Sequence, residues 1–176
     1  MELVDAAYAY VLDNGLSEMS LRPIAEAIGS STGVLRFLFG SRDGLVAAVL
    51  HRAREDELQL LDRLPAGGDL LTVGTAVWAW LADPAHAALL RLWTESYAIS
   101  LKATDGPWAG HAARTVGDWL AVLGKSQPAA VRRTAAGRAQ RTAILAVLRG
   151  GMLDLLATGD EARTTRAVHR ALAALV

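Results

Sequence analysis

The residues with the most distinctive chemistry gather between positions 20 and 45, where hydroxyls, guanidinium groups and glycines alternate with apolar side chains. Arg36 could read guanine through two parallel hydrogen bonds, and Arg42 suits a phosphate oxygen. Gly33 would let the backbone approach a partner closely. Chemistry of this kind is typical of contacts with double-stranded DNA. The candidate DNA-contacting residues are Ser20, Arg22, Ser31, Thr32, Gly33, Arg36, Phe37, Ser41 and Arg42.

The apolar spacing around these positions predicts a helix-turn-helix, a motif that places one helix in the major groove of DNA. Ser20 is a suitable N-cap for a first helix, and Gly29 is suited to ending it. Ser30 and Ser31 then form the turn, and a second helix spans 32–39. The expected inward positions are Leu21, Ile24, Ala25 and Ile28 in the first helix and Leu35, Leu38 and Phe39 in the second. A plainer interpretation is that these are merely packed helices of an all-α protein.

The rest of the chain also follows a helical pattern. A helix is expected over 2–14, and Ser41 is expected to cap a long helix reaching about residue 64, with Leu45, Val49, Leu50, Leu58 and Leu61 on its apolar side. The sequence PAGGD at 65–69 breaks the pattern and marks the best boundary. Further helices are expected over about 70–82, 84–103, 107–124, 128–157 and 160–176. We therefore expect an all-α fold with an N-terminal three-helix helix-turn-helix domain, 1–50, followed by a larger helical domain, 51–176.

The composition favours a folded helical protein and gives no sign of export. Hydrophobic residues make up 52% of the 176 residues, which is too many for a disordered chain. Cysteine is absent, so disulfides and thiolate metal sites are excluded. No cationic start precedes an apolar run, and no apolar stretch is long enough to span a membrane. We expect a cytoplasmic protein that does not interact with membranes.

The charge distribution restricts any DNA-binding surface to a small area. The net charge is zero, and residues 1–64 hold six arginines against ten acids, a balance of −4. A DNA-binding domain usually carries a basic footprint, so here it must be local and made by Arg22, Arg36 and Arg42. Residues 125–149 hold six basic residues and no acid. They form either a second nucleic-acid or anion surface or a solvated face that pairs with the acidic residues 55–57.

Catalytic and metal-binding motifs are absent from the sequence. His51, His86, His111 and His169 are scattered and lack the spacing of metal ligands. The chain has no phosphate-binding glycine loop of the Walker type and no serine within G-x-S-x-G. We therefore expect neither an enzyme nor a cofactor.

Aromatic residues after position 69 offer two interpretations. All five tryptophans lie there, and Trp93 and Tyr97 share one helix face because they are four residues apart. An apolar pocket with a few hydroxyls would suit a small apolar or aromatic ligand, whereas the same rings could simply fill a core. The candidate pocket residues are Trp78, Trp93, Tyr97, Ser100, Trp108 and Trp119.

The last two helical patterns carry leucines at the spacing of a helix–helix seam. Two such helices from each of two chains could form a four-helix dimer interface, although packing within one chain would give the same pattern. Gly150 and Gly151 weaken a helix, and close approach of helices at a dimer seam would explain them. The candidate interface residues are Leu145, Leu148, Met152, Leu155, Val168, Leu172 and Leu175.

Two blocks of sequence, DAAYAYVLDNG (5–15) and SLRPIAEAIGSSTGVLRFLFGSRDGL (20–45), resemble the TetR family of bacterial transcriptional regulators. The resemblance covers about the first 50 residues, and LRGGMLDLLATGDEAR (148–163) loosely matches the late helices of the family. It implies that Thr32, Gly33, Arg36 and Phe37 take recognition-helix positions. Arg42 takes the place of a phosphate-contacting lysine.

The resemblance also implies a function and shows two departures. It implies a homodimeric repressor that is released from a palindromic operator when a ligand binds the larger ligand-binding and dimerisation domain. A tyrosine commonly stands in the family at Arg36, and a histidine or tyrosine at Leu38. The family often has a basic arm before the first helix, and because the sequence begins at Met1 we expect no minor-groove contacts from such an arm. The alternative is a helical ligand-binding or scaffold protein that has lost specific DNA binding.

Overall fold

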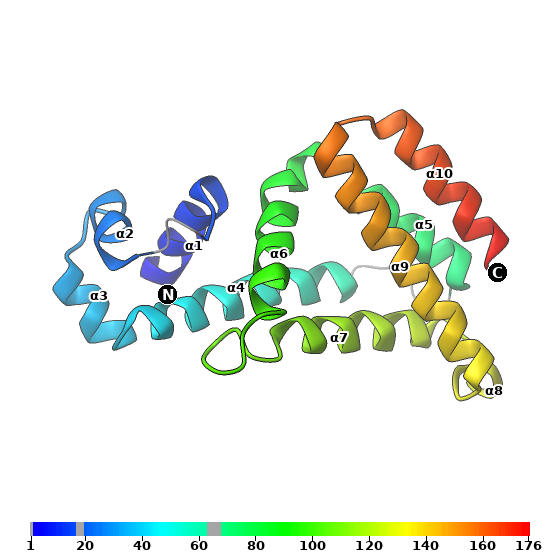
Figure 1. The fold of residues 1–176 in the computed structure, drawn as a ribbon, viewed down its shortest axis with the longest axis horizontal. Coiled ribbons are helices and arrows are strands. Elements are labelled where there is room, and N and C mark those ends of the chain that lie inside the picture. Colours follow the sequence, from blue (N-terminus) through cyan, green and yellow to red (C-terminus); the bar gives the residue numbers. More distant parts are fainter. Residues whose placement is uncertain (1, 17–19, 63–67) are drawn as a thin grey trace. The chain divides into compact units, whose positions relative to one another are not determined.

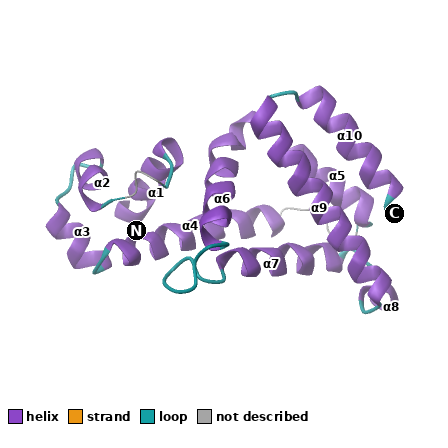
Figure 2. Ribbon diagram, in the orientation of Figure 1, coloured by secondary structure: helices purple, strands orange, loops and turns teal. Residues whose placement is uncertain are grey.

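The regular structure of the described residues is helical throughout (Figures 1 and 2). A computed structural model describes the chain except residues 1, 17–19 and 63–67 and the side chains of residues 2 and 60–62. The elements are α1 (Glu2–Asn14), α2 (Leu21–Ala27), α3 (Thr32–Phe39), α4 (Arg42–Asp62), α5 (Leu70–Leu81), η1 (Pro84–His86), α6 (Ala87–Ser100), α7 (His111–Lys125), α8 (Ala129–Arg132), α9 (Ala135–Thr158) and α10 (Glu161–Ala174). The expected all-α fold is confirmed.

These helices form two compact units that are not consecutive in the sequence. The N-terminal unit comprises Met1–Leu60 and Arg91–Ala113, and the C-terminal unit comprises Leu61–Leu90 and Arg114–Val176. The sequence predicted two consecutive domains that divide at residue 50. In the structure, part of α6 and the loop that follows it also belong to the N-terminal unit. No helix in the described part of the chain is long and apolar enough to cross a membrane.

The core of the N-terminal unit uses most of the apolar positions that the sequence predicted. Ile24 and Ala25 of α2, Leu35 of α3, and Leu45 and Val49 of α4 are all buried. Burial of these side chains supplies most of the free energy that holds the short helices together, because helices of seven or eight residues are not stable alone.

Two predicted core positions are wrong in this unit. Leu38 is exposed, because the inward stripe of the two-turn helix α3 runs through Leu35 and half-buried Phe39. Leu38 instead belongs to the outward stripe, one turn after Val34. Leu58 of α4 is also exposed. The predictions for Leu61 and for the end of α4 near residue 64 fall outside the described residues.

The C-terminal unit packs α5 against α9 and α10. Its core includes Val77 and Trp78 of α5, Leu148 of α9 and Leu172 of α10. The indole N–H of Trp78 donates a hydrogen bond of 3.0 Å to the Thr165 hydroxyl, so the one polar atom of this buried ring is satisfied.

Three predicted helices in the second half have different bounds. The 128–157 pattern divides into α8 and α9, because Thr134 adopts an extended backbone and its hydroxyl caps α9 by accepting from the N–H of Gly137. The 107–124 helix begins only at His111, after a series of turns. The 84–103 pattern starts with the 3₁₀ turn η1 before α6.

Candidate nucleic-acid interface

The reversal between α2 and α3 is built by backbone hydrogen bonds around Gly29. The N–H of Ser30 donates to the carbonyl of Ala25 at 2.8 Å, and the N–H of Gly29 donates to Glu26 at 3.3 Å. This is a Schellman pattern, and it requires the left-handed conformation in which Gly29 lies, at φ +64°. The predicted role of Gly29 in ending α2 is therefore confirmed.

The first turn of α3 begins with a side-chain cap. The hydroxyl of Ser31 accepts a hydrogen bond of 3.2 Å from the N–H of Val34. The N-terminus of a helix carries a partial positive charge and N–H groups without helical partners, which suits it to a phosphate. Ser20 stands at the N-cap of α2, as predicted, but its side chain makes no capping hydrogen bond there.

The outward face of α3 carries the residues that the sequence assigned to DNA. Leu35 is fully buried and anchors the helix, while Thr32, Gly33, Arg36 and Phe37 are exposed. The structure thus places the four predicted recognition positions on an accessible surface. Sequence reasoning missed that Val34 and Leu38 are also exposed on this helix.

The corner between α3 and α4 positions Ser41 and Arg42. Gly40 ends α3 with φ +72°, and the Ser41 hydroxyl accepts a hydrogen bond of 3.1 Å from the N–H of Gly44. Arg42 is exposed at the first position of α4. Gly44 was not singled out by the sequence, although a Cβ atom there would lie 1.8 Å from the carbonyl oxygen of Phe39. The only sign of this close approach in the sequence was a glycine in the first turn of a predicted helix.

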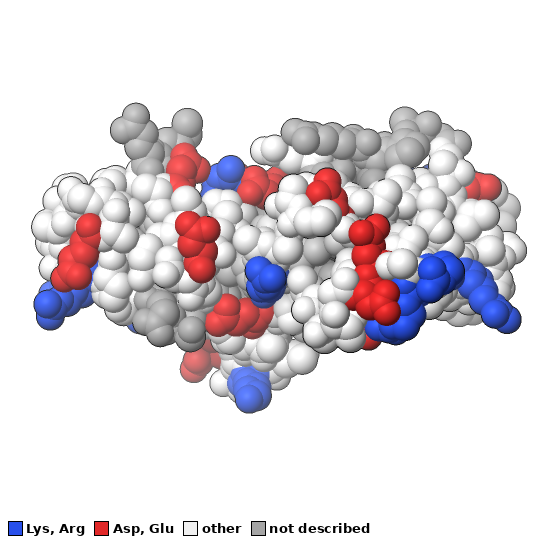
Figure 3. Space-filling view, turned by 90° about the horizontal axis from the view of Figure 1, so that it is seen from above, with Lys and Arg blue, Asp and Glu red and all other residues white. Residues whose placement is uncertain are grey.

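Three exposed arginines lie on α2, α3 and the start of α4. The guanidinium of Arg22 pairs with Glu26 at 2.9 Å, and both side chains are exposed on α2. Arg36 and Arg42 are also exposed. On the face seen in Figure 3, Lys and Arg side chains stand in separate groups with Asp and Glu side chains between them.

A charged network joins α1 to α4, the helix that carries Arg42. The Arg52 guanidinium donates to Asp5 at 2.9 Å and to Asp56, and it lies 5.2 Å from the centre of the Tyr8 ring. The Tyr8 hydroxyl donates to Asp56 at 2.9 Å. Burial, followed by this hydrogen bond, raises the pKa of Tyr8 well above its usual value. Two of the ten acids counted in the sequence thus neutralise a cation inside this network.

The predicted pocket residues divide between the two units. Trp93 and Tyr97 are half-buried on α6 of the N-terminal unit, and half-buried Trp108 lies in the loop that follows. Trp78 and Trp119 belong to the C-terminal unit, where both are buried. Trp78 is a core residue there, so its ring leaves no surface for a ligand.

Ser100 closes the loop after α6. Its hydroxyl donates to the carbonyl of Trp108 at 2.7 Å and accepts from the N–H of Ala112 at 2.9 Å. These two hydrogen bonds explain why a serine is buried at this position. Five residues earlier on α6, the Glu95 carboxylate accepts a hydrogen bond of 2.8 Å from the N–H of Leu16, which connects the residues after α1 to α6. The hydrogen bond between Leu16 and Glu95 was not predicted from the sequence.

The predicted dimer residues lie mostly inside the C-terminal unit. Leu145, Leu148, Val168 and Leu172 are buried within the chain itself, which leaves them almost no accessible surface for a partner. They face inward because α9 and α10 pack on each other and on α5. Met152, Leu155 and Leu175 are half-buried.

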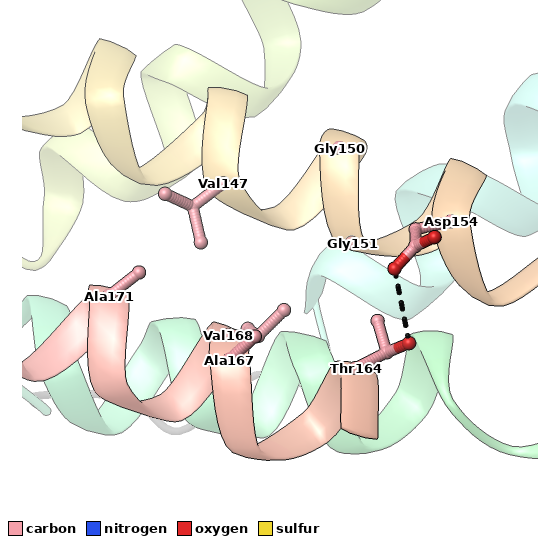
Figure 4. A pocket seen from close by; sticks show the side chains of 8 residues that line it. All are labelled: Val147, Gly150, Gly151, Asp154, Thr164, Ala167, Val168 and Ala171. Carbon is pink, nitrogen blue, oxygen red and sulfur yellow. Dashed lines mark hydrogen bonds between the residues drawn. The ribbon is translucent and has the colours of Figure 1, made fainter. Parts of the chain in front are cut away.

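A shallow groove runs between α9 and α10, and side chains from both helices point toward it (Figure 4). The carboxylate of Asp154 accepts a hydrogen bond of 3.4 Å from the Thr164 hydroxyl at one end, and Arg163 pairs with Asp154 at 2.7 Å. The groove is lined by Val147, Gly150, Gly151, Asp154, Thr164, Ala167, Val168 and Ala171.

The two glycines of this groove have different surroundings. A Cβ atom at Gly151 would lie 2.5 Å from Val168 and 2.9 Å from the Trp78 ring, so packing within the chain requires a glycine there. A Cβ atom at Gly150 would meet nothing within 4 Å. Only Gly151 is therefore explained by the fold of a single chain.

The order of elements defines an all-α protein with an N-terminal helix-turn-helix and a second helical unit, and comparison with solved structures agrees. The chain superposes on a transcriptional regulator from Rhodococcus sp. Rha1 with a TM-score of 0.82 and 18% identity, covering 98% of this chain and 93% of that one. The multidrug binding protein EbrR, solved with imidazole, gives a TM-score of 0.69 and 23% identity over 96% of this chain and 87% of EbrR.

A third structure carries the family name. A TetR-family member from Streptomyces coelicolor A3 matches with a TM-score of 0.66 and 25% identity, over 96% of this chain and 95% of that one. No family model and no curated protein matches the sequence. The chain therefore has the fold of the TetR-family transcriptional regulators, and the resemblance seen in its first 50 residues extends to the whole chain at the level of the fold.

Proposed function

We propose that this protein is a DNA-binding transcriptional regulator that uses α3 as its recognition helix. The observation that carries the proposal is the outward face of α3, where Thr32, Gly33, Arg36 and Phe37 are exposed while Leu35 anchors the helix in the core. A helix held in this way can enter the major groove, and the start of α4 can bind the adjacent phosphates. The fold shared with structures described as transcriptional regulators supports it.

We further propose that the protein acts as a homodimer on a palindromic operator. A two-fold dimer presents two recognition helices, which must be about one helical turn of DNA apart to read two half-sites. The exposed side of α9 and α10 is the surface we assign to the partner. It carries exposed Leu153, and Gly150 has open space where a second helix could approach.

A variant pair tests this assignment of the interface. Gly150→Leu places a large side chain on the proposed contact surface, and Gly117→Leu places the same side chain in open space on α7. Light scattering coupled to size exclusion should report a dimer for the parent and for Gly117→Leu. The proposed interface predicts that Gly150→Leu shifts the protein toward the monomer. Equal dimer fractions for both variants would reject the interface.

We propose that a small apolar or aromatic ligand releases the protein from DNA, so that it acts as a repressor. One similar structure, with a TM-score of 0.69 and 22% identity, is described as EbrR complexed with proflavin, and that finding belongs to EbrR. Trp93, Tyr97 and Trp108 are the half-buried aromatic residues that could contact such a ligand here. Proflavin is therefore the first probe, and quenching of tryptophan fluorescence is the measurement.

The alternative is a helical ligand-binding or scaffold protein that has lost specific DNA binding. It is motivated by the balance of −4 in residues 1–64, since DNA-binding domains are usually basic. A band-shift assay separates the two functions. The full-length protein is titrated against the DNA upstream of its own gene, with an unrelated duplex of equal length as the control, at several salt concentrations. A regulator shifts the upstream duplex selectively at moderate salt, whereas equal shifts of both duplexes favour the alternative.

A further inference from the structure

The outward face of α3 is mainly apolar. Phe37 is 88% exposed, and its neighbours Leu38 and Val34 are 51% and 43% exposed. Val34 lies three residues before Phe37 and four before Leu38, so the three side chains form one stripe along the helix. An aromatic ring left almost wholly in water on a soluble domain points to a binding surface.

Gly33 leaves the first turn of α3 open toward solvent. A Cβ atom at Gly33 would meet only the Ser31 hydroxyl, at 3.6 Å. The backbone of the first turn can therefore approach a partner surface closely.

The residues of α3 limit which base edges it can read. Adenine is usually read by Asn or Gln and cytosine by Asp or Glu, and none of these occurs in Thr32–Phe39. Arg36 is the one side chain of α3 that suits guanine. What remains for an apolar side chain in the major groove is the 5-methyl group of thymine.

We propose that Phe37, with Val34 beside it, determines sequence specificity by contacting thymine methyl groups, next to a guanine read by Arg36. The inference rests on the proposed function and adds the chemistry of the half-site. The charge of α3 favours DNA as the occupant of the stripe, because its single charged residue is Arg36 and its N-terminus carries exposed Ser31 and Thr32. A helix end with these features suits a polyanion.

The test replaces thymidine by deoxyuridine, which removes the methyl group and keeps the base-pairing edge. The full-length protein first selects a binding duplex from a random-sequence library. Each thymine of the selected site is then replaced by uracil, one position at a time, with uracils outside the site as the control. The inference predicts affinity about fourfold weaker for each contacted methyl group removed, and no change at the control positions.

Variants connect the effect to the named side chain. Phe37→Ala should weaken binding to the thymine duplex by about tenfold and should abolish the difference between the thymine and uracil duplexes. Leu101→Ala removes a side chain that is 69% exposed elsewhere in the same unit, and it should change neither quantity. Thermal unfolding should be the same for both variants, because neither side chain is buried.

The outcomes separate the two proposals. If the library yields no enriched duplex, the regulator proposal fails and the inference fails with it. If a duplex is enriched but uracil substitution is neutral in the parent, or if Phe37→Ala remains as sensitive to uracil as the parent, the regulator proposal survives and the inference is overturned. A Phe37→Ala variant with unchanged affinity for DNA would assign the stripe to a protein partner and would also overturn it.

Discussion

The carbonyl oxygen of Phe39 occupies the space where Gly44 would carry a side chain. A Cβ atom built at residue 44 would lie 1.8 Å from that oxygen and 3.0 Å from the carbonyl carbon. The last turn of α3 therefore approaches the first turn of α4 as closely as a backbone without a side chain allows. This contact sets the position of the start of α4, where Arg42 lies, relative to α3.

We expect Gly44→Ala to disrupt this corner. The added methyl group meets backbone rather than a flexible side chain, so α4 must move, and we expect a loss of about 3 kcal/mol in the free energy of unfolding. Chemical denaturation followed by circular dichroism measures the loss. The binding of DNA should weaken as well, because Ser41 and Arg42 move with the start of α4.

Gly117→Ala is the matched control for that variant. Gly117 is an exposed glycine inside α7, and a Cβ atom there would meet nothing within 4 Å. Alanine is the better helix former, so this variant should be more stable than the parent by up to about 1 kcal/mol. A Gly44→Ala variant that gains stability in the same way would show that the close approach does not exist in solution.

Local signals account for the parts of the site that the sequence predicted correctly. Ser30 and Ser31 as the turn, Gly29 as a terminator and Leu35 as an inward residue each depend on a few neighbouring residues, so the span of α3 followed from local residue types. The same reasoning failed at Leu38, because a short helix buries one narrow stripe and the choice between two leucines depends on the surrounding helices.

Contacts between distant residues lay beyond the sequence. The sequence alone does not distinguish Gly150 from Gly151. In the structure only Gly151 lies against Trp78, which is more than seventy residues away in the chain. The hydrogen bond between Leu16 and Glu95 and the network around Arg52 are likewise products of the fold. The break between α8 and α9 was missed because the apolar pattern continues across it without proline or glycine.

The two glycines of α9 should respond oppositely to alanine. Gly151→Ala would bring a methyl group within 2.5 Å of Val168 and 2.9 Å of the Trp78 ring, and we expect it to lower stability by about 1–2 kcal/mol. Gly150→Ala adds a methyl group in open space, so helix propensity should raise the stability of the monomer by up to about 1 kcal/mol. Denaturation at low protein concentration, where dimers dissociate, measures both. Equal effects of the two substitutions would contradict the packing at Gly151.

The network of α1 and α4 should make the protein sensitive to alkali. Tyr8 has a pKa raised above its usual value of 10.0, first by burial and then by its hydrogen bond to Asp56. Its folded form thus holds the proton more tightly than the unfolded chain. The contribution of Tyr8 to the free energy of unfolding is constant below about pH 10. It is lost as the pH rises further, because Tyr8 then ionises in the unfolded chain before it ionises in the folded protein.

Tyr8→Phe isolates that contribution. The variant lacks the ionisable hydroxyl, so the fall of stability above pH 10 should be less steep than in the parent. At neutral pH it should be about 1 kcal/mol less stable, because the carboxylate of Asp56 loses a donor. Urea denaturation at a series of pH values measures the stability difference at neutral pH and the slope of stability above pH 10. Parallel stability curves for the parent and the variant above pH 10 would refute the role of Tyr8.

Arg36 and Arg42 should differ in what they contribute to DNA binding. Arg42 stands at the exposed start of α4, beside the capped turn at Ser41, where a cation and free helix N–H groups suit a phosphate. Arg42→Ala should weaken binding to all sequences alike and lower the slope of log affinity against log salt by about one per protomer.

Arg36→Ala should instead relax the preference for guanine at one position of each half-site, at a cost of about 1–3 kcal/mol. Binding isotherms on matched and mismatched duplexes at several salt concentrations distinguish the two effects. An unchanged salt slope for Arg42→Ala would remove Arg42 from the phosphate contacts.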